Sequence, residues 1–535
     1  MKTGEEILKR FGDLKQGRSR FESLWQQIAE RMLPGSADFV SKRQAGEERT
    51  ERMYDATAAL ALRSYSQFVE SNVTPATQRW HRMTISDEDL DDNPEVKLYL
   101  DEWNGLLFRE RYSPATNFSG QISEVYPELG AFGNGSLYTD EVPGYGLRYS
   151  ARKLSETYFS ENHVGLIDTV FRRYPLTARQ AVEEFGKERV PPHIYRCVER
   201  APDSLHWFVQ AVIPNDGTET GEGVREDHLF ASITISEDGA HVMRRSGFYS
   251  FPYAIARDLT SPGEIYGRSP GVWVLPDVKM LNEMNRSVIR AAHKAVEPPM
   301  MLTEDGALQS FDFRPGALNY GALGPNGERL ALPMESGSRL DIGVELMAAK
   351  QEAIRSAFYI NLFQIFADDG RQRTAYEVAR REQEKAMLLG PLVGRLRSEF
   401  RERLVQREID LHIRAGRAPE MPRVLIDRGG ANFTLHHESP IARAQRAEEG
   451  VAVIQTMESI ASLVQVQPDI LDNFDTDEIA RVMAEVNGMG AKLVRPADQV
   501  AAIREQRAQQ QQQQAMADAA PGVARAAKDL SQVAA

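Results

Sequence analysis

The feature that most constrains this fold is a pair of helix-forming segments joined by a Gly- and Pro-rich stretch. The first segment, 272–297, alternates polar and apolar residues at helical spacing and ends at Pro298-Pro299, which cannot continue a helix. The second segment, 339–358, has small apolar residues at the same spacing. These residues are Ile342, Leu346, Ala349 and Ala353. We predict two antiparallel helices that carry a compact insertion, 298–338, at their far end.

A basic stripe follows one side of the first helix. On a helical wheel of about 100° per residue, its members fall within about 60° of Lys279. They are Lys279, Arg286, Arg290, His293 and Lys294. The opposite side carries Leu281, Met284, Val288, Ala291, Ala292 and Ala295. Such a stripe is most often a solvated surface, and Glu283 interrupts this one. If the hairpins stood in a ring, however, the basic faces would line a channel and the apolar faces would pack between neighbours.

The remaining chain predicts a mainly α protein with a β-rich portion, an α+β class. Four segments of the first third have helical periodicity: 5–32, 54–73, 95–111 and 120–132. Between about 205 and 250, apolar runs alternate with turns such as Asn215-Asp216-Gly217, which predicts an antiparallel meander.

The last third is predicted to be helical as well. A long helix covers 374–414 with a kink at Gly390-Pro391. A strand segment follows it before 439, and helices continue from 440 to about 487. The end, 501–535, contains six glutamines in a row and is a low-complexity tail, helical at first.

Composition narrows the class of protein. The 535 residues can form about two to four domains, and 42% hydrophobic and 26% charged residues are typical of a globular chain. The single cysteine, Cys197, excludes an intramolecular disulfide framework. No apolar stretch approaches the length of a membrane span, so we expect no membrane association. The net charge of −13 argues against tight DNA binding, but not against a conduit through which DNA slides.

The sequence offers no pattern for catalysis. It has no phosphate loop, no nucleophile elbow and no His-Glu-x-x-His motif. The adjacent pair His436-His437 is a poor metal site, because neighbouring side chains of a strand point to opposite faces. The acidic run at 87–92 is typical of a solvated surface. We therefore expect no catalytic residue, no metal and no cofactor, which favours a structural or assembly protein over an enzyme.

Three blocks of sequence, in this order, resemble podovirus head-to-tail connecting proteins. They lie at 80–86, at 266–285 and at 373–378. The first is Trp80-His81-Arg82-Met83-Thr84-Ile85-Ser86. The second joins Tyr266-Gly267-Arg268-Ser269-Pro270 to a helix containing Leu281-Asn282-Glu283-Met284-Asn285, and the third is Arg373-Thr374-Ala375-Tyr376-Glu377-Val378. The resemblance extends to about residue 490.

The resemblance implies a portal fold with wing, stem, clip and crown regions. On this chain they correspond to the wing at 1–271, stem helices at 272–297 and 339–358, the clip at 298–338, a tunnel loop at 359–373, the wing again at 374–439, and the crown at 440–500. The residues 501–535 have no counterpart. The tunnel loop would present Asp368, Asp369, Arg371 and Arg373 to the channel.

The implied function is that of a portal, a dodecameric ring at one vertex of the capsid. Double-stranded DNA would pass through it during packaging and ejection, touched at its phosphates without base reading. The implied partners are the terminase motor, then tail or adaptor proteins, and the major capsid and scaffolding proteins. The protein would be assembled in the host cytoplasm and reside in the virion.

Two other classes stay open at this point. One is another structural virion protein, such as a capsid or internal core protein. The other is a nucleic-acid enzyme, such as a nuclease or a terminase, which would need a nucleotide loop or a metal-binding acid cluster.

Overall fold

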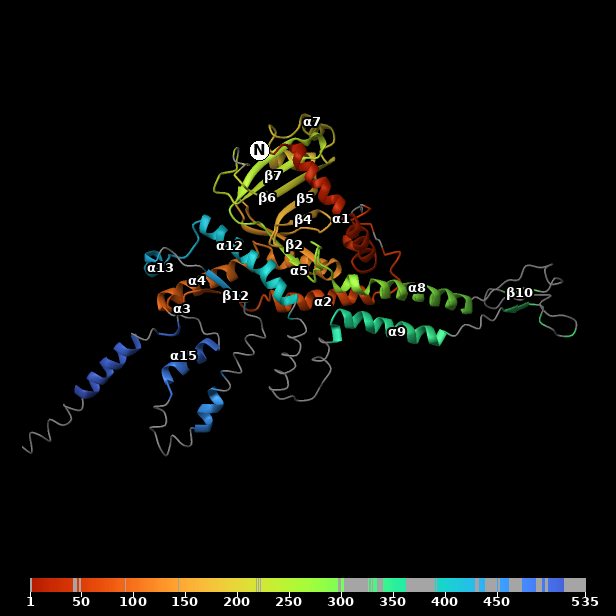
Figure 1. The fold of residues 1–535 in the computed structure, drawn as a ribbon. Helices are drawn as coiled ribbons and strands as arrows, with labels where there is room; N and C mark the ends of the chain where they lie inside the picture. Colours follow the sequence, from red (N-terminus) through yellow and green to blue (C-terminus); the bar gives the residue numbers. More distant parts are fainter. Residues whose placement is uncertain are drawn as a thin grey trace, which may run out of the picture. The chain divides into compact units, whose positions relative to one another are not determined.

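The computed structural model (Figure 1) describes most of the chain. The described residues are 2–41, 46–47, 50–91, 93–142, 144–217, 219, 221, 223–296, 300–302, 326, 329, 331–333, 340–361, 390, 392–428, 433–437, 450, 453–460, 474–486, 493–495 and 499–513. The chain divides into two compact units. The first comprises Met1–Thr77 and Glu110–Gly416, and the second Gln78–Arg109 and Arg417–Ala535. Helices and antiparallel strands occur in both, which confirms the α+β class.

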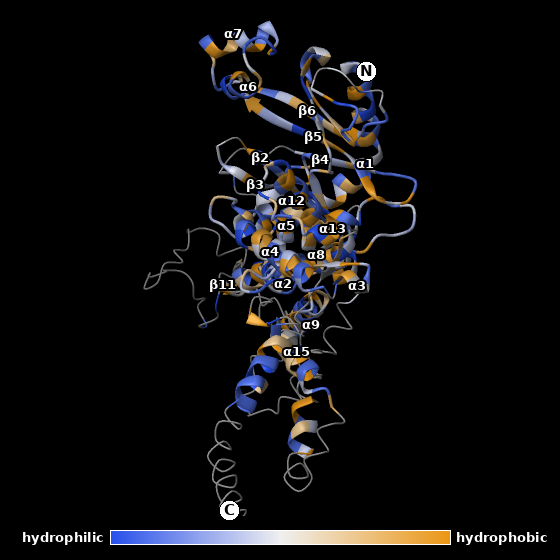
Figure 2. Cartoon of the chain, turned by 90° about the vertical axis from the view of Figure 1, so that its left-hand side faces the viewer, coloured by the Kyte–Doolittle hydropathy of each residue, from blue (hydrophilic) through white to orange (hydrophobic). Residues whose placement is uncertain are grey.

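Three of the predicted N-terminal helices belong to the first unit: α1 (Gly4–Met32), α2 (Thr57–Val73) and α5 (Phe118–Phe132). α1 begins where the sequence supplies a capping box, because Thr3 and Glu6 exchange side-chain to backbone hydrogen bonds. The C-terminal part of α5 is buried, and apolar residues gather around this helix in Figure 2. None of the helices in the described ranges is both long and apolar enough to cross a lipid bilayer.

The first unit contains a five-stranded antiparallel sheet (Figure 1). Its strands follow chain order: β4 (Thr157–Glu161), β5 (Ile167–Thr177), β6 (Leu205–Pro214), β7 (Phe230–Ser236) and β8 (Val242–Phe248). The last three strands confirm the meander predicted between 205 and 250. Two short helices, α6 (Ala178–Phe185) and α7 (Pro192–Arg200), lie in the connection between β5 and β6.

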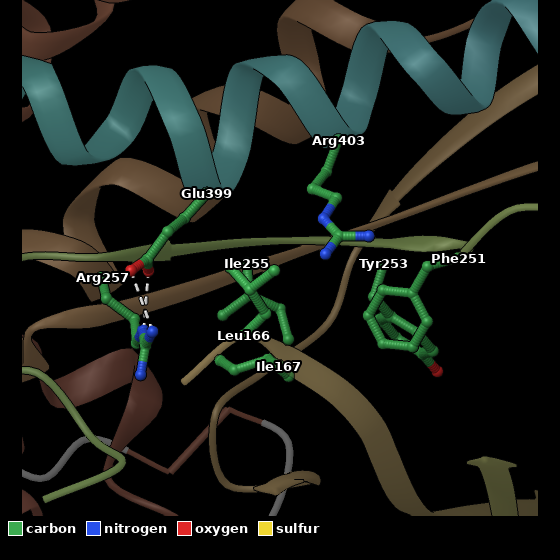
Figure 3. Close-up of a pocket in the computed structure, with 8 residues that line it drawn as sticks. All are labelled: Leu166, Ile167, Phe251, Tyr253, Ile255, Arg257, Glu399 and Arg403. Atoms are coloured by element: carbon green, nitrogen blue, oxygen red, sulfur yellow. Dashed lines mark hydrogen bonds and ion pairs between the residues drawn. The ribbon is translucent and has the colours of Figure 1, made fainter. Parts of the chain in front are cut away.

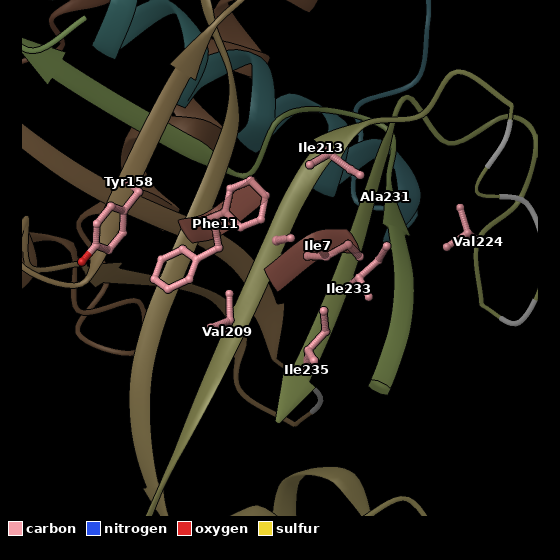
Figure 4. Close-up of a cluster of buried hydrophobic side chains, with 11 residues drawn as sticks. Ile7, Phe11, Tyr158, Val209, Ile213, Val224, Ala231, Ile233 and Ile235 are labelled. Carbon is pink, nitrogen blue, oxygen red and sulfur yellow. The ribbon is translucent and has the colours of Figure 1, made fainter. Parts of the chain in front are cut away.

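Alternation along β6 places apolar residues on both faces of this sheet. Val209, Ala211 and Ile213 lie in one core, where Ile7 and Phe11 of α1 pack against them (Figure 4). Phe208 lies in the other core, which the helices α6 and α7 close. The sheet is therefore buried on both sides, by α1 on one face and by the α6–α7 pair on the other.

A smaller sheet has β2 (Asn134–Val142) between β3 (Gly146–Ala151) and β9 (Tyr253–Arg257). It packs against α12 (Glu402–Arg414), which follows a π-helical turn, Leu396–Arg401. A buried ion pair between Arg111 and Glu408, which also accepts a hydrogen bond from Tyr149, fixes α12 against the rest of the unit. These contacts place the C-terminal half of the predicted long helix. Its first half, 374–389, and Pro391 of the predicted kink lie outside the described residues.

The second unit joins two distant parts of the chain. β1 (His81–Ile85) pairs antiparallel with β12 (Phe433–His437), and the amide oxygen of Asn104 accepts a hydrogen bond from the Met83 backbone. The helices of this unit include α3 (Glu88–Asp91), α4 (Pro94–Arg111) up to Arg109, α13 (Arg423–Asp427) and α15 (Thr476–Val486). Further helical residues are 453–460 and 499–513, which agrees with the predicted helices after 440 and in the first part of the tail.

The first third of the chain is less helical than predicted. Strands β1 to β5 all lie before residue 178, and none of them was predicted. The first residues of β2, Asn134, Gly135 and Ser136, have a weak strand propensity, whereas β4 and β5 are rich in β-branched and aromatic residues. A side chain at Gly135 would place its Cβ 2.6 Å from Cγ1 of Val125, so the close packing of α5 on β2 requires a glycine. At the start of β2, tertiary packing rather than local propensity makes the strand.

Candidate functional site: the α8–α9 hairpin

The predicted helical pair is present as two long helices that run side by side (Figure 1). They are α8 (Pro270–Val296) and α9 (Leu340–Ala357), within a few residues of the predicted 272–297 and 339–358. At their far end β10 (Met300–Leu302) pairs antiparallel with β11 (Ala331–Pro333). This strand pair lies in the predicted insertion at 298–338, of which the structure describes 300–302, 326, 329 and 331–333.

The start of α8 explains the glycine, serine and proline of the block at 266–270. A Cβ on Gly267 would lie 2.5 Å from the carbonyl oxygen of Gly133, so no larger residue fits. The hydroxyl of Ser269 donates to the carbonyl of Ala131 at the end of α5, at 2.8 Å. Pro270 then opens the helix, where its missing N–H costs nothing. The block therefore docks α8 on the end of α5.

The two helices hold each other by a close approach and an ion pair. Val288 of α8 lies against Gly343 of α9. A Cβ added at Gly343 would be 3.4 Å from Cγ2 of Val288. Nearer the rest of the unit, Lys350 donates to Asp277 at 2.8 Å. Burial ends partway along the hairpin. Leu281 is 1% exposed, whereas the described side chains of α8 beyond Asn282 are half-buried or exposed.

The inner end of α9 is anchored in the core of the first unit. Ile354 and Phe358 are fully buried, and the ring of Phe358 packs edge-on against Tyr65 of α2, with 6.0 Å between ring centroids. The outer part of α9 differs. Of the small apolar residues predicted to form one face, Leu346, Ala349 and Ala353 are exposed, and the side chain of Ile342 is outside the described ones.

The inner members of the basic stripe have partners within the same chain. The ammonium group of Lys279 donates to the side-chain oxygen of Gln27 on α1. The guanidinium of Arg286 lies 5.9 Å from the ring centroid of Tyr54 and 3.6 Å from the carboxylate of Glu283, the acid that interrupts the stripe.

The outer members of the stripe, Arg290, His293 and Lys294, are exposed. The structure therefore separates the five residues into an inner pair that contacts the first unit and an outer triplet that faces solvent. The predicted tunnel-loop residues cannot be placed beside them, because Asp368, Asp369, Arg371 and Arg373 all lie outside the described residues.

Three polar residues of the hairpin were not predicted to have a role of their own. Asn282 and Asn285 stood out only as part of a resembling block, and Gln351 not at all. In the structure, all three contact the segment before α2. Asparagine has a poor propensity for helix interiors, so two of them spaced three residues apart in α8 were a signal that their side chains serve another purpose.

A hollow beside β9 is a second candidate (Figure 3). The guanidinium of Arg403 points toward it, and Arg257 at its edge pairs with Glu399 through two hydrogen bonds of 2.7 and 2.9 Å. Burial lowers the pKa of Arg257, but the hydrogen bonds that it donates to Glu399 and Glu161 more than compensate and raise it. The arrangement stabilises a buried guanidinium by pairing it with two carboxylates.

Metal binding has no support in the part of the chain that the structure describes. There, no group of three or more His, Cys, Asp or Glu residues is placed to hold an ion. The side chains of His436 and His437 are not among those described, and only their backbones are placed, in β12 opposite β1.

Comparison with known proteins gives a consistent result over almost the whole chain. Residues 4–494 match the family described as bacteriophage head to tail connecting protein. The chain is 29% identical to a probable portal protein of Bordetella phage BPP-1, over 95% of this chain and 91% of that one. It is 27% identical to the portal protein of Salmonella phage epsilon15, over 99% and 95%. With the portal protein of Escherichia phage T7 it shares 21% identity, over 77% and 75%.

The chain therefore belongs to the bacteriophage head to tail connecting protein family. Within that class its function is that of a portal protein, the component that connects the phage head to the tail.

Proposed function

We propose that copies of this portal protein form a dodecameric ring in which the α8–α9 hairpins surround a channel for double-stranded DNA. The observation that carries this proposal is the exposed surface of the hairpin's outer half, which has basic and apolar parts. The basic triplet lies on α8, which also exposes Ile289 and Val296, and α9 exposes a face that contains Leu346. A ring gives each of these surfaces a distinct neighbour.

The apolar residues support contact between copies. Leu346 is 49% exposed in the single chain, and Ala349 and Ala353, three and seven residues later on the same face of α9, are exposed as well. Contiguous exposed apolar residues are typical of an interaction surface. A contact between two different surfaces of identical chains repeats around an axis and closes into a ring when the rotation allows it. The subunit number itself comes from the resemblance to the family.

The outer basic triplet supports contact with DNA. Repeated around a ring, Arg290, His293 and Lys294 form belts of positive charge that match phosphates and read no bases. The net charge of −13 keeps the affinity of the whole protein for DNA low, which suits a strand that must slide. The residues Asp368, Asp369, Arg371 and Arg373 of the tunnel loop are proposed as further channel residues.

The roles proposed for the remaining regions come from the resemblance to the family. The clip, 298–338, meets the terminase motor during packaging and the tail or adaptor proteins afterwards. The wing, 1–271 and 374–439, and the crown, 440–500, face the capsid and scaffolding proteins. The protein acts as a structural component at the portal vertex, not as an enzyme, after assembly in the host cytoplasm.

Electron microscopy of the purified full-length protein tests the proposal. We expect rings with a central hole and twelve-fold averages, with the hairpins around the hole. Shells or filaments would indicate a capsid or core protein instead. Hydrolysis of ATP or cleavage of DNA by the purified protein would overturn the structural role.

A further inference from the structure

A short segment between α1 and α2 connects three helices at the root of the hairpin. We call this segment, Thr50–Asp55, the strap. The guanidinium of Arg52 donates to Glu30 of α1 at 2.7 Å. At the other end of the strap, the backbone amides of Tyr54 and Asp55 both donate to the side-chain oxygen of Asn282 on α8, at 2.6 and 3.1 Å.

The carboxylate of Asp55 completes this connection. One of its oxygens accepts hydrogen bonds from Asn285 of α8 at 3.1 Å and from Gln351 of α9 at 2.8 Å. The other accepts the backbone N–H of Thr57, in the first turn of α2, at 2.8 Å. A single side chain thus joins both helices of the hairpin to the start of α2. We call Asp55, Asn282, Asn285 and Gln351 the joint.

The joint is charged and partly shielded from water. Burial raises the pKa of Asp55, but the hydrogen bonds from Thr57, Gln351 and Asn285 outweigh it and bring the pKa below its ordinary value. The carboxylate is therefore ionised at neutral pH, and its hydrogen bonds are of the stronger, charge-assisted kind.

The position of the joint along the hairpin gives it leverage. Asn282 is 4% exposed, and from the next residue outward the described side chains of α8 are no longer buried. At a rise of about 1.5 Å per residue, the part of α8 beyond Asn285 is about 16 Å long. A rotation of about 10° at the joint would therefore move the end of α8 by about 3 Å.

We propose that Asp55 is a positioning residue that sets the direction in which the α8–α9 hairpin leaves the first unit, and so the bore of the channel. This inference rests on the proposed ring. It assigns to the block Leu281-Asn282-Glu283-Met284-Asn285 a role that its membership of a helix does not explain. The two asparagines are hydrogen-bonding partners of the strap, and neither belongs to the basic stripe.

The test uses a substitution that changes charge without changing shape. Gln351→Glu places a second carboxylate against Asp55 in place of an amide donor, so the joint opens. Adding Asp55→Asn restores a complementary pair, because the new amide donates to the new carboxylate. Asp55→Asn alone removes the charge and keeps hydrogen-bonding groups, since the amides of Asn285 and Gln351 can turn, and we expect it to fall between wild type and Gln351→Glu. Gln16→Glu adds the same charge at an exposed position of α1.

Three measurements on the full-length protein follow the joint. Hydrogen exchange reports opening at 54–57 and in α9, electron microscopy reports ring formation and bore, and complementation of a portal-deficient phage reports packaged DNA. Losing hydrogen bonds to a charged group changes an opening equilibrium by about tenfold or more. We expect Gln351→Glu to speed exchange at both segments by at least that factor, to leave the subunit number unchanged, and to alter the bore and reduce packaging. The double variant should recover all three.

The outcomes separate the joint from the ring. Wild-type bore and packaging with Gln351→Glu, or failure of Asp55→Asn to restore them, would overturn the positioning role. If the wild-type protein forms no ring, the proposed function fails. The positioning of the hairpin is then decided by exchange alone: faster exchange in Gln351→Glu with recovery in the double variant supports it, and unchanged exchange rejects it. A variant that merely unfolds would exchange faster throughout the chain and form no rings, whereas opening of the joint speeds exchange at 54–57 and in α9 and leaves the rings assembled.

Discussion

The inner and outer halves of the α8–α9 hairpin carry the same kinds of residues in different surroundings. In the inner half, Lys279 donates to Gln27 and Leu281 is buried. In the outer half, Arg290 and Leu346 are both exposed. Helical periodicity places residues on a face but does not say what covers that face. The inner half takes its partners from its own chain, and the outer half is left for other molecules.

The largest expected difference between the halves concerns their apolar residues. Phe358→Ala removes a fully buried ring from the core and should lower the free energy of unfolding by about 3–5 kcal/mol. Leu346→Ala should change it by less than about 0.5 kcal/mol, because the side chain is already half exposed. Scanning calorimetry under conditions that keep the chain monomeric measures both.

The ranking of these two variants should be reversed when ring assembly is measured in place of stability. Leu346→Ala should shift the sedimentation profile from rings toward single chains, since it removes part of the proposed contact between copies. A Leu346 variant that loses as much stability as the Phe358 variant would show that the outer face is packed within the chain.

The inner half of the hairpin is also expected to make the stability of the protein depend on pH, through Asp258. Burial raises the pKa of Asp258 to about 7, although Arg395 and the Leu259 backbone act to lower it. The charge of Asp258 also contributes to raising the pKa of Tyr65 and of Tyr359. Tyr65 packs against Phe358, and Tyr359 follows Phe358 in the chain. Between pH 4 and about 7 the folded protein keeps a proton that the unfolded chain has released. The stability from this group is therefore present at low pH and is lost as the pH rises through that window.

Asp258→Asn should remove this loss. We expect the variant to exceed wild type by about 2–4 kcal/mol at pH 8 and to approach it near pH 4. Chemical denaturation at a series of pH values checks the crossing of the two curves. Leu346→Ala changes the exposed outer half without altering a titratable group, so it is the control and should leave the pH profile unchanged. A stability gain that is the same at pH 4 and pH 8 would contradict the assignment to proton uptake.

The sequence was most informative where the signals are local. Amphipathic periodicity and the double proline Pro298-Pro299 placed both helices of the hairpin within a few residues. The start of β2 could not be predicted in this way, because residues such as Gly135 enter a sheet only when α5 packs against it. Local propensity carries no information about such contacts. The β-branched and aromatic residues of β4 and β5 were a local strand signal that the prediction missed.

The candidate site divides along the same line. The helical wheel predicted that the five basic residues share a face. It could not show that Lys279 contacts Gln27 and that Arg286 contacts Tyr54. The partners come from a segment more than two hundred residues earlier in the chain. The contribution of Arg290, His293 and Lys294 to a channel stays a prediction, as does that of the tunnel loop.

The smallest expected effects come from substitutions in the basic stripe. They distinguish its inner pair from its outer triplet. Arg290→Ala combined with Lys294→Ala should leave ring formation and thermal stability unchanged, because both side chains are exposed. It should reduce the salt dependence of DNA binding by the rings, by about one unit of slope for each phosphate that is no longer neutralised. Lys279→Met should do the opposite. It removes a hydrogen bond to Gln27 and should lower the free energy of unfolding by about 1 kcal/mol, with no change in the salt dependence. Fluorescence anisotropy of labelled duplex DNA across a salt series measures the first property, and calorimetry measures the second. If Lys279→Met lowered the slope as much as the outer pair did, the inner half would also face DNA, and its contact with α1 would have to open in the ring.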